Sequence, residues 1–72
     1  MKNIKFESVQ SSNILSVGYD NSTNSLYVNY KSGIYKYDNV ESSVYENLMS
    51  SDSKGRFMNE NIKGKYNYSR MV

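Results

Sequence analysis

Hydrophobic and polar residues alternate between residues 14 and 38, which predicts three consecutive β-strands. In the first, 14–19, we expect Leu15, Val17 and Tyr19 to share one face, with Ile14 on the other. The second, 26–31, alternates with Leu26, Val28 and Tyr30 on one side, and the third, 34–38, presents Tyr35 and Tyr37 together. Turn-forming residues separate the strands at 20–25 and at 31–33, where Gly33 can adopt positive φ.

The period changes after Asn39. Val44, Tyr45, Leu48 and Met49 follow a helical spacing, and either Asn39 or Ser42 is a suitable N-cap. Ser53 is expected to cap a second short helix whose apolar stripe is Phe57, Met58 and Ile62, and Gly64 is expected to end that helix at C′.

These patterns predict an α+β fold: a three-stranded antiparallel β-meander followed by two short α-helices packed on one face. Residues 1–72 form a single domain, in which residues 1–8 are either a flexible arm or an edge strand. The residues expected to be mostly buried are Leu15, Val17, Leu26, Val28, Val44, Leu48, Phe57 and Ile62.

Composition excludes several classes of function. The 72 residues contain no cysteine and no histidine, which removes disulfides, the usual zinc and iron–sulfur ligands, and the commonest catalytic base. No nucleophile elbow or phosphate-cradling GxxxxGK pattern is present. We therefore expect a protein that is not an enzyme and needs no cofactor or metal. No apolar run reaches the ~20 residues of a membrane span and the start lacks a secretory signal, so we expect a cytoplasmic location without membrane contact.

Charge is unevenly distributed although the net charge is only +2. Residues 54–72 contain five cations and one carboxylate, whereas residues 1–53 contain four cations and six carboxylates. Asp20, Asp38 and Asp52 lie in or beside predicted turns, where capping explains them. A basic end on a mildly acidic body favours a localised anion-binding surface over a polycation that coats nucleic acid indiscriminately.

The stretch 53–57, Ser-Lys-Gly-Arg-Phe, joins a capping serine to two cations at a helix start. Free backbone N–H groups there can bind an anion, and Arg56 can hold two oxygens at once. Gly55 would lie in the first turn, where the missing side chain lets an anion approach. The alternative interpretation is an ordinary helix start with solvated charges.

The tyrosines also allow two interpretations. Tyr35 and Tyr37 either pack in the core, which we favour because aliphatic residues are few, or stack on bases from an open sheet face. Tyr66 and Tyr68 alternate with cations in the tail, 65–72, which suits phosphate contact with base stacking. That tail could equally fold back on the sheet.

In order along the chain, a set of short segments resembles the KTSC domain family. These segments are Ser11-Ser12-Asn13-Ile14, Val17-Gly18-Tyr19-Asp20, Leu26-Tyr27-Val28, Ser32-Gly33, Tyr35-Lys36-Tyr37, Val40, Val44-Tyr45, Leu48, Ser53-Lys54-Gly55-Arg56-Phe57, Asn59, Ile62 and Tyr66. The resemblance implies a domain found at the C-terminus of some lysyl-tRNA synthetases and as small bacterial or phage proteins, for which RNA binding is suspected. Two positions depart from the family pattern. Glu41 replaces a proline before the first helix, and Met58 replaces the second ring of an aromatic pair.

Two functional classes follow. The first is a module that binds RNA or a nucleotide-type phosphate ligand. Its candidate phosphate-binding residues are Ser53, Lys54, Gly55, Arg56, Asn59, Lys63, Lys65 and Arg70, and its candidate stacking residues are Tyr66, Tyr35 and Tyr37. The second is a protein-interaction module that binds itself, as a homo-oligomer, or a host protein. A phage protein of this family could act against host defence by sequestering a nucleotide signal or masking a protein.

Overall fold

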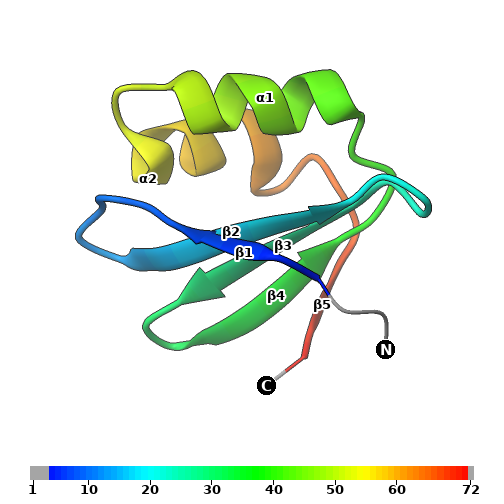
Figure 1. Ribbon diagram of the computed structural model, residues 1–72, viewed down its shortest axis with the longest axis horizontal. Helices are drawn as coiled ribbons and strands as arrows, with labels where there is room; N and C mark the ends of the chain where they lie inside the picture. The colour runs from blue at the N-terminus through cyan, green and yellow to red at the C-terminus, as the bar shows by residue number, and fades with distance from the viewer. Residues whose placement is uncertain (1–3, 72) are drawn as a thin grey trace.

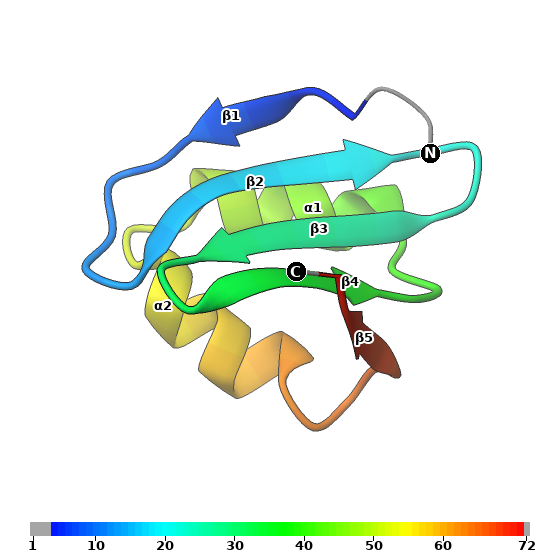
Figure 2. The ribbon, with the colours of Figure 1, turned by 90° about the horizontal axis from the view of Figure 1, so that it is seen from below.

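Two layers make up the fold: a five-stranded antiparallel sheet and a pair of helical segments that cover one of its faces (Figure 1). The computed structural model describes residues 4–71. The strands lie in sequence order, so that every connection joins neighbours (Figure 2). They are β1 (Phe6–Ser8), β2 (Ile14–Asp20), β3 (Ser25–Tyr30), β4 (Gly33–Tyr37) and β5 (Tyr68–Arg70).

The predicted meander is confirmed as β2–β4, but the predicted number of strands is too small by two. Residues 6–8 form an edge strand, one of the two alternatives for this segment, and residues 1–3 lie outside the described range. The tail folds back on the sheet, where Tyr37 pairs with Tyr68 and Tyr35 with Arg70. Both additional strands are only three residues long, too short for an alternating pattern to identify.

The core lies between the sheet and the helices. Val17, Leu26, Val28, Leu48 and Ile62 are fully buried there, as predicted, while Val44 and Phe57 are partly buried against the same cluster. The cluster also contains Tyr37, and Tyr35 packs against it, which agrees with the core position favoured for this pair. Three further members, Ile14, Val40 and Met58, were not on the list of residues expected to be buried.

The prediction that Leu15 is buried is wrong: Leu15 is 48% exposed, whereas its neighbour Ile14 is buried. Ile14 pairs with Tyr30 and Ser16 with Asn29, so that Leu15 is an extra residue in β2. This β-bulge shifts the alternation by one position and places Ile14 and Val17 on the core face. Leu15 points away from the core as a result.

Helix α1 (Ser42–Ser50) starts without a side-chain cap. Glu41 occupies the N-cap position and makes no capping hydrogen bond, so neither Asn39 nor Ser42 has the predicted role. Asn39 instead adopts a left-handed conformation, with φ of 57°, in the turn that leads from β4 to the helix. Leu48 is the one residue of α1 that is fully buried, and it anchors the helix on the sheet.

The second helical segment begins as predicted and then widens. Ser53 caps α2 (Lys54–Phe57) by accepting a hydrogen bond from the Arg56 amide. A π-helix, η1 (Met58–Ile62), follows directly and closes with a 2.7 Å hydrogen bond from the Lys63 amide to the Met58 carbonyl. Gly64, at φ of 80°, ends the segment at C′. Single π-turns of this kind occur frequently at functional sites.

β1 is the edge strand beside β2, and its Phe6 side chain lies on the face of the sheet opposite the helices. Phe6 pairs with Gly18, and its ring makes an edge contact with Tyr27 at 6.2 Å between centroids. Tyr27 is only 6% exposed, so this short arm covers part of the second face. Neither helical segment of the described chain has the length and apolar character needed to cross a bilayer.

Candidate functional site

Two adjoining pockets lie between the β3–β4 turn and the end of η1. The first, the aromatic pocket, has a volume of about 470 Å³ and is lined by Tyr30, Ser32, Tyr35, Tyr37, Lys63, Gly64 and Tyr68. The second, the polar pocket, has a volume of about 250 Å³ and is lined by Asn13, Ile14, Tyr30, Lys31, Ser32, Gly55, Asn59 and Lys63. They share Tyr30, Ser32 and Lys63, and together we call them the groove.

Strand register explains how the tyrosines come together. The two-residue turn at 31–32 pairs Tyr30 with Gly33 and Val28 with Tyr35, so that Tyr30, Tyr35 and Tyr37 all face the helix layer. Strand β5 adds Tyr68 beside Tyr37. The rings form a continuous cluster. Tyr30 and Tyr35 are in an edge contact at 5.5 Å, and Tyr68 lies 5.7 Å from Tyr35 and 5.8 Å from Tyr37.

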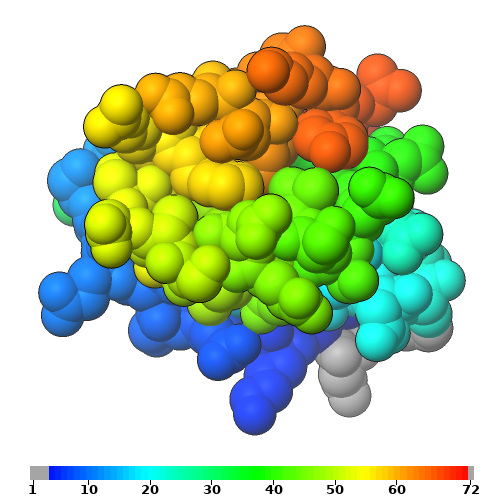
Figure 3. All heavy atoms as spheres, turned by 90° about the horizontal axis from the view of Figure 1, so that it is seen from above, coloured from blue at the N-terminus to red at the C-terminus, as the bar shows by residue number. Residues whose placement is uncertain are grey.

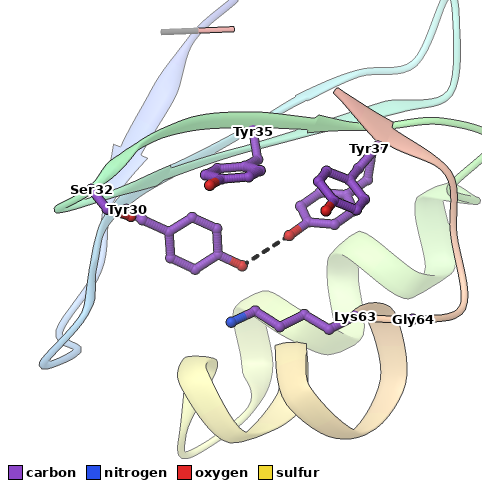
Figure 4. Close-up of a pocket in the computed structure, with 7 residues that line it drawn as sticks. Tyr30, Ser32, Tyr35, Tyr37, Lys63 and Gly64 are labelled. Atoms are coloured by element: carbon purple, nitrogen blue, oxygen red, sulfur yellow. Dashed lines mark hydrogen bonds between the residues drawn. The ribbon is translucent and has the colours of Figure 1, made fainter. Parts of the chain in front are cut away.

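Two phenol groups meet inside the aromatic pocket, where the hydroxyl oxygens of Tyr30 and Tyr37 are hydrogen-bonded at 3.1 Å (Figure 4). Burial raises the pKa of both phenols above the ordinary value, and the hydrogen bond raises the pKa of Tyr30 further. Both hydroxyls are therefore neutral at physiological pH and can donate and accept hydrogen bonds.

Lys63 is the cation at the centre of the groove. It follows η1 directly, and its ammonium nitrogen lies 5.1 Å from the centre of the Tyr30 ring, in a cation–π contact (Figure 4). The polar pocket adds Lys31, and no carboxylate is among the residues that line either pocket. The electrostatic field in this part of the described chain is therefore suited to an anion.

Of the residues predicted from the sequence, six belong to the groove or its rim. Lys63, Tyr35 and Tyr37 line the aromatic pocket, and Gly55 and Asn59 line the polar pocket. Gly55 lies in the first turn of α2, as predicted. Arg70 donates a 2.8 Å hydrogen bond from its guanidinium to the carbonyl of Ser32, at the rim.

The other predicted residues do not line either pocket. The Lys54 ammonium donates a 2.7 Å hydrogen bond to the Ser51 carbonyl, and the Arg56 guanidinium pairs with Glu60 at 3.0 Å. Lys65 is exposed beyond the π-turn, and Tyr66 is partly buried against the core. These cations do not converge at the start of α2, which is four residues long and aligns few peptide dipoles.

Groove residues that the sequence analysis did not single out for binding are Tyr30, Ser32, Asn13, Ile14, Lys31 and Gly64. Tyr68, one of the two tail tyrosines for which stacking was one interpretation, lines the aromatic pocket. The signal for Tyr30 was present, because the expected turn at 31–33 already places the end of one strand beside the start of the next. The alternation of tyrosines with cations indicated Tyr68, but its position beside Tyr37 depends on a tail strand that has no pattern of its own.

Seen from above, α2 and η1 lie side by side with α1, over the sheet (Figure 3).

Carboxylates outside the groove have local roles. Asp20 accepts hydrogen bonds from the amide and hydroxyl of Ser22 in the β2–β3 turn, and Asp38 forms an ion pair with Lys36 at 3.9 Å. The contacts of Asp20 agree with the turn role expected for it.

Comparison with known proteins gives consistent results. The sequence pattern of the KTSC domain matches residues 10–66. An uncharacterized protein of Stutzerimonas stutzeri strain A1501 is 37% identical over 70 residues, which cover 94% of this chain and 99% of the relative. A lysine–tRNA ligase of Nostoc punctiforme is 37% identical over 54 residues, which cover 74% of this chain but only 10% of the ligase.

A solved structure supports the same assignment. The crystal structure of a KTSC domain protein from Yersinia pestis superimposes with a TM-score of 0.94 at 37% identity, covering 97% of this chain and all of that one. The resemblance noted in the sequence is thereby confirmed: the chain belongs to the KTSC domain family.

Proposed function

We propose that this KTSC domain is a small, non-catalytic module that binds single-stranded RNA or a nucleotide, and that the ligand lies in the groove. The observation that carries the proposal is that four tyrosine rings and two lysines, Lys63 and Lys31, line adjoining pockets whose lining contains no carboxylate. Rings that stack on bases and cations that contact phosphate are the usual means of binding single strands. The absence of histidine and cysteine argues against catalysis.

Family context supports the same ligand class. One relative is a lysine–tRNA ligase, and the matched segment is a tenth of its length. A small appended domain that binds RNA would suit such an enzyme.

The start of α2 is proposed as a secondary phosphate contact. Gly55 lines the polar pocket, and its neighbours in the sequence, Lys54 and Arg56, are cations close to that lining residue.

The test is fluorescence anisotropy with a short labelled single-stranded RNA over a range of salt concentrations. We expect binding to weaken as salt increases, because phosphate contacts release counterions. Lys63→Ala should weaken binding by about 1.5–3 kcal/mol and reduce the slope of log K against log salt by about 0.7. Lys5→Ala, at an exposed lysine just before β1 and on the far edge of the sheet from β4 and β5, is the matched control.

Arg56→Ala separates two positions for the phosphate. Because Arg56 already pairs with Glu60, we expect a smaller loss than from Lys63→Ala. An equal loss would place the phosphate at the start of α2, as the sequence alone predicts. If Lys5→Ala weakens binding as much as Lys63→Ala, the binding is diffuse electrostatics and the groove is not the site.

A protein-interaction module is the second candidate. Leu15, Tyr68 and Met71 are large apolar side chains that remain 44–59% exposed, and such residues suit a contact with another protein or a second copy. An apolar interface would persist at high salt, whereas phosphate binding would not. Native mass spectrometry of protein purified from cells distinguishes a homo-oligomer or protein complex from a co-purified nucleotide.

A further inference from the structure

We propose that the groove recognises one nucleotide as a unit, with its base in the aromatic pocket and its phosphate in the polar pocket. This inference rests on the proposed function and narrows it to a defined ligand. The shared chemistry is that of a nucleoside monophosphate, either free in solution or as one unpaired residue of an RNA strand.

The aromatic pocket has the size and walls for a planar ring. Its volume of about 470 Å³ lies within the range of roughly 300–1,000 Å³ typical of small-molecule sites. Tyr68 is 59% exposed and forms the outer wall, while Tyr37 is 3% exposed and forms the inner one. The two rings are 5.8 Å apart, too close for a base to enter between them, so a base would lie against the exposed ring of Tyr68 without a change in the core.

The hydroxyl pair favours a base over a purely apolar ring. One of the two hydroxyls of Tyr30 and Tyr37 donates to the other, which leaves one O–H of the pair free to donate and also leaves acceptor capacity on both oxygens. A hydrocarbon ligand would leave this remaining O–H without a partner, at a cost in free energy. The nitrogen and carbonyl edge of a base can satisfy them.

The polar pocket suits a compact anion. At about 250 Å³ it is smaller than typical small-molecule sites, and it contains two lysines, Lys31 and Lys63. At Gly55 it is open, because a Cβ built there would approach only the Ser11 hydroxyl, at 3.8 Å. A phosphate can therefore approach the backbone of α2 at this point.

Lys63 joins the two parts of the ligand. It lines both pockets, together with Tyr30 and Ser32, so that a group in one pocket is adjacent to a group in the other. The contact of its ammonium with the Tyr30 ring keeps the cation at this junction. It also opposes a cationic ligand in the aromatic pocket, which four tyrosines alone would accept.

The experiment is isothermal titration calorimetry with three probes: a nucleoside 5′-monophosphate, the corresponding nucleoside and ribose 5-phosphate. We expect the nucleotide to bind at least about tenfold more tightly than either fragment. Tyr68→Ala should weaken the nucleotide and the nucleoside by roughly tenfold and leave ribose 5-phosphate unchanged. Lys63→Ala should weaken the nucleotide and ribose 5-phosphate and leave the nucleoside unchanged.

Tyr37→Phe keeps the ring and removes only the hydroxyl, so it tests whether this hydroxyl forms a hydrogen bond with the edge of the base. Circular dichroism verifies that each variant is folded. We expect weaker binding of the nucleotide and the nucleoside but not of ribose 5-phosphate. Equal losses for all three probes in Tyr68→Ala, or ribose 5-phosphate that binds as tightly as the nucleotide, would overturn the proposal.

A last comparison distinguishes a free nucleotide from an RNA strand as the ligand. It also separates the single-nucleotide proposal from the broader proposal that the groove binds RNA. Competition between the nucleotide and single-stranded RNA identifies the tighter source. If an oligonucleotide with abasic sites binds as tightly as intact RNA, the single-nucleotide proposal is wrong, whereas RNA binding by the groove stands. If no RNA or nucleotide binds, both proposals fail and the protein-interaction candidate is favoured.

Discussion

Two glycines in this chain occupy opposite environments. A Cβ built on Gly18 would lie 2.7 Å from the Ile4 side chain and 3.2 Å from the Lys5 carbonyl, because the segment before and within β1 crosses directly above it. A Cβ on Gly55 has only the Ser11 hydroxyl near it, at 3.8 Å. Gly18 is therefore required by packing, whereas Gly55 is not.

Alanine at each glycine should have opposite effects on stability. Gly18→Ala should lower the free energy of unfolding by about 1–3 kcal/mol, since β1 must move away. Gly55→Ala should raise it by up to about 1 kcal/mol, because alanine is the better helix former, while the added methyl group weakens ligand binding in the polar pocket. Urea unfolding followed by circular dichroism measures both. A large loss of stability from Gly55→Ala would instead indicate a backbone role for that glycine.

Residue-level prediction from the sequence succeeded where a local pattern decides the outcome. Ser53 as a cap, Gly64 as the helix end and Gly33 with positive φ are set by backbone chemistry within a few residues. The prediction for Leu15 was wrong because a short alternating run does not reveal a β-bulge. Either Ile14 or Leu15 could face the core in such a run, and only the pairing with β3 decides which one does.

At the scale of elements, α1 and the start of β2 offer a direct test of that bulge. Leu48 is fully buried beneath α1, and Leu15 is 48% exposed. Leu48→Ala should lower the free energy of unfolding by about 2–5 kcal/mol through the cavity that it leaves. Leu15→Ala, the same change at an exposed position, should alter it by no more than about 0.5 kcal/mol. Thermal and urea unfolding of both variants would show similar losses only if Leu15 is packed in the core.

The elements differ in how far the sequence predicts them. The meander and both helical segments follow from their periods, but the change from α2 to η1 does not, because residues 58–62 carry no composition that separates a π-turn from an α-turn. That change sets where Lys63 leaves the helix, and so where the cation of the groove lies. The candidate site was therefore predicted in its residue types, but its position in the groove required the tertiary structure.

For the whole molecule, the buried tyrosines predict a loss of stability in alkali. Burial raises the pKa of Tyr19, Tyr30, Tyr37 and Tyr45 above the unfolded value of about 10. Above that pH the unfolded chain releases these protons while the native state retains them, so the free energy of unfolding falls as pH rises. Below pH 10 this contribution is fully present.

Urea unfolding at a series of pH values from neutral to above pH 10 measures this effect. We expect a constant midpoint up to about pH 9 and a steady decrease above it. Tyr37→Phe should reduce the decrease, since one phenol with a raised pKa is removed. A midpoint that stays constant through this range would mean that the tyrosine hydroxyls titrate equally in both states.

The short outer strands have a consequence for how copies of this chain meet. A sheet with open edges can grow by adding strands from other molecules, and a long, flat, apolar edge favours such growth. Here the edges are β1 and β5, of three residues each, while the longer strands β2 and β3 are enclosed between neighbours. The outer strands thus terminate the sheet on both sides, which protects a tyrosine-rich chain against polymerisation into fibrils.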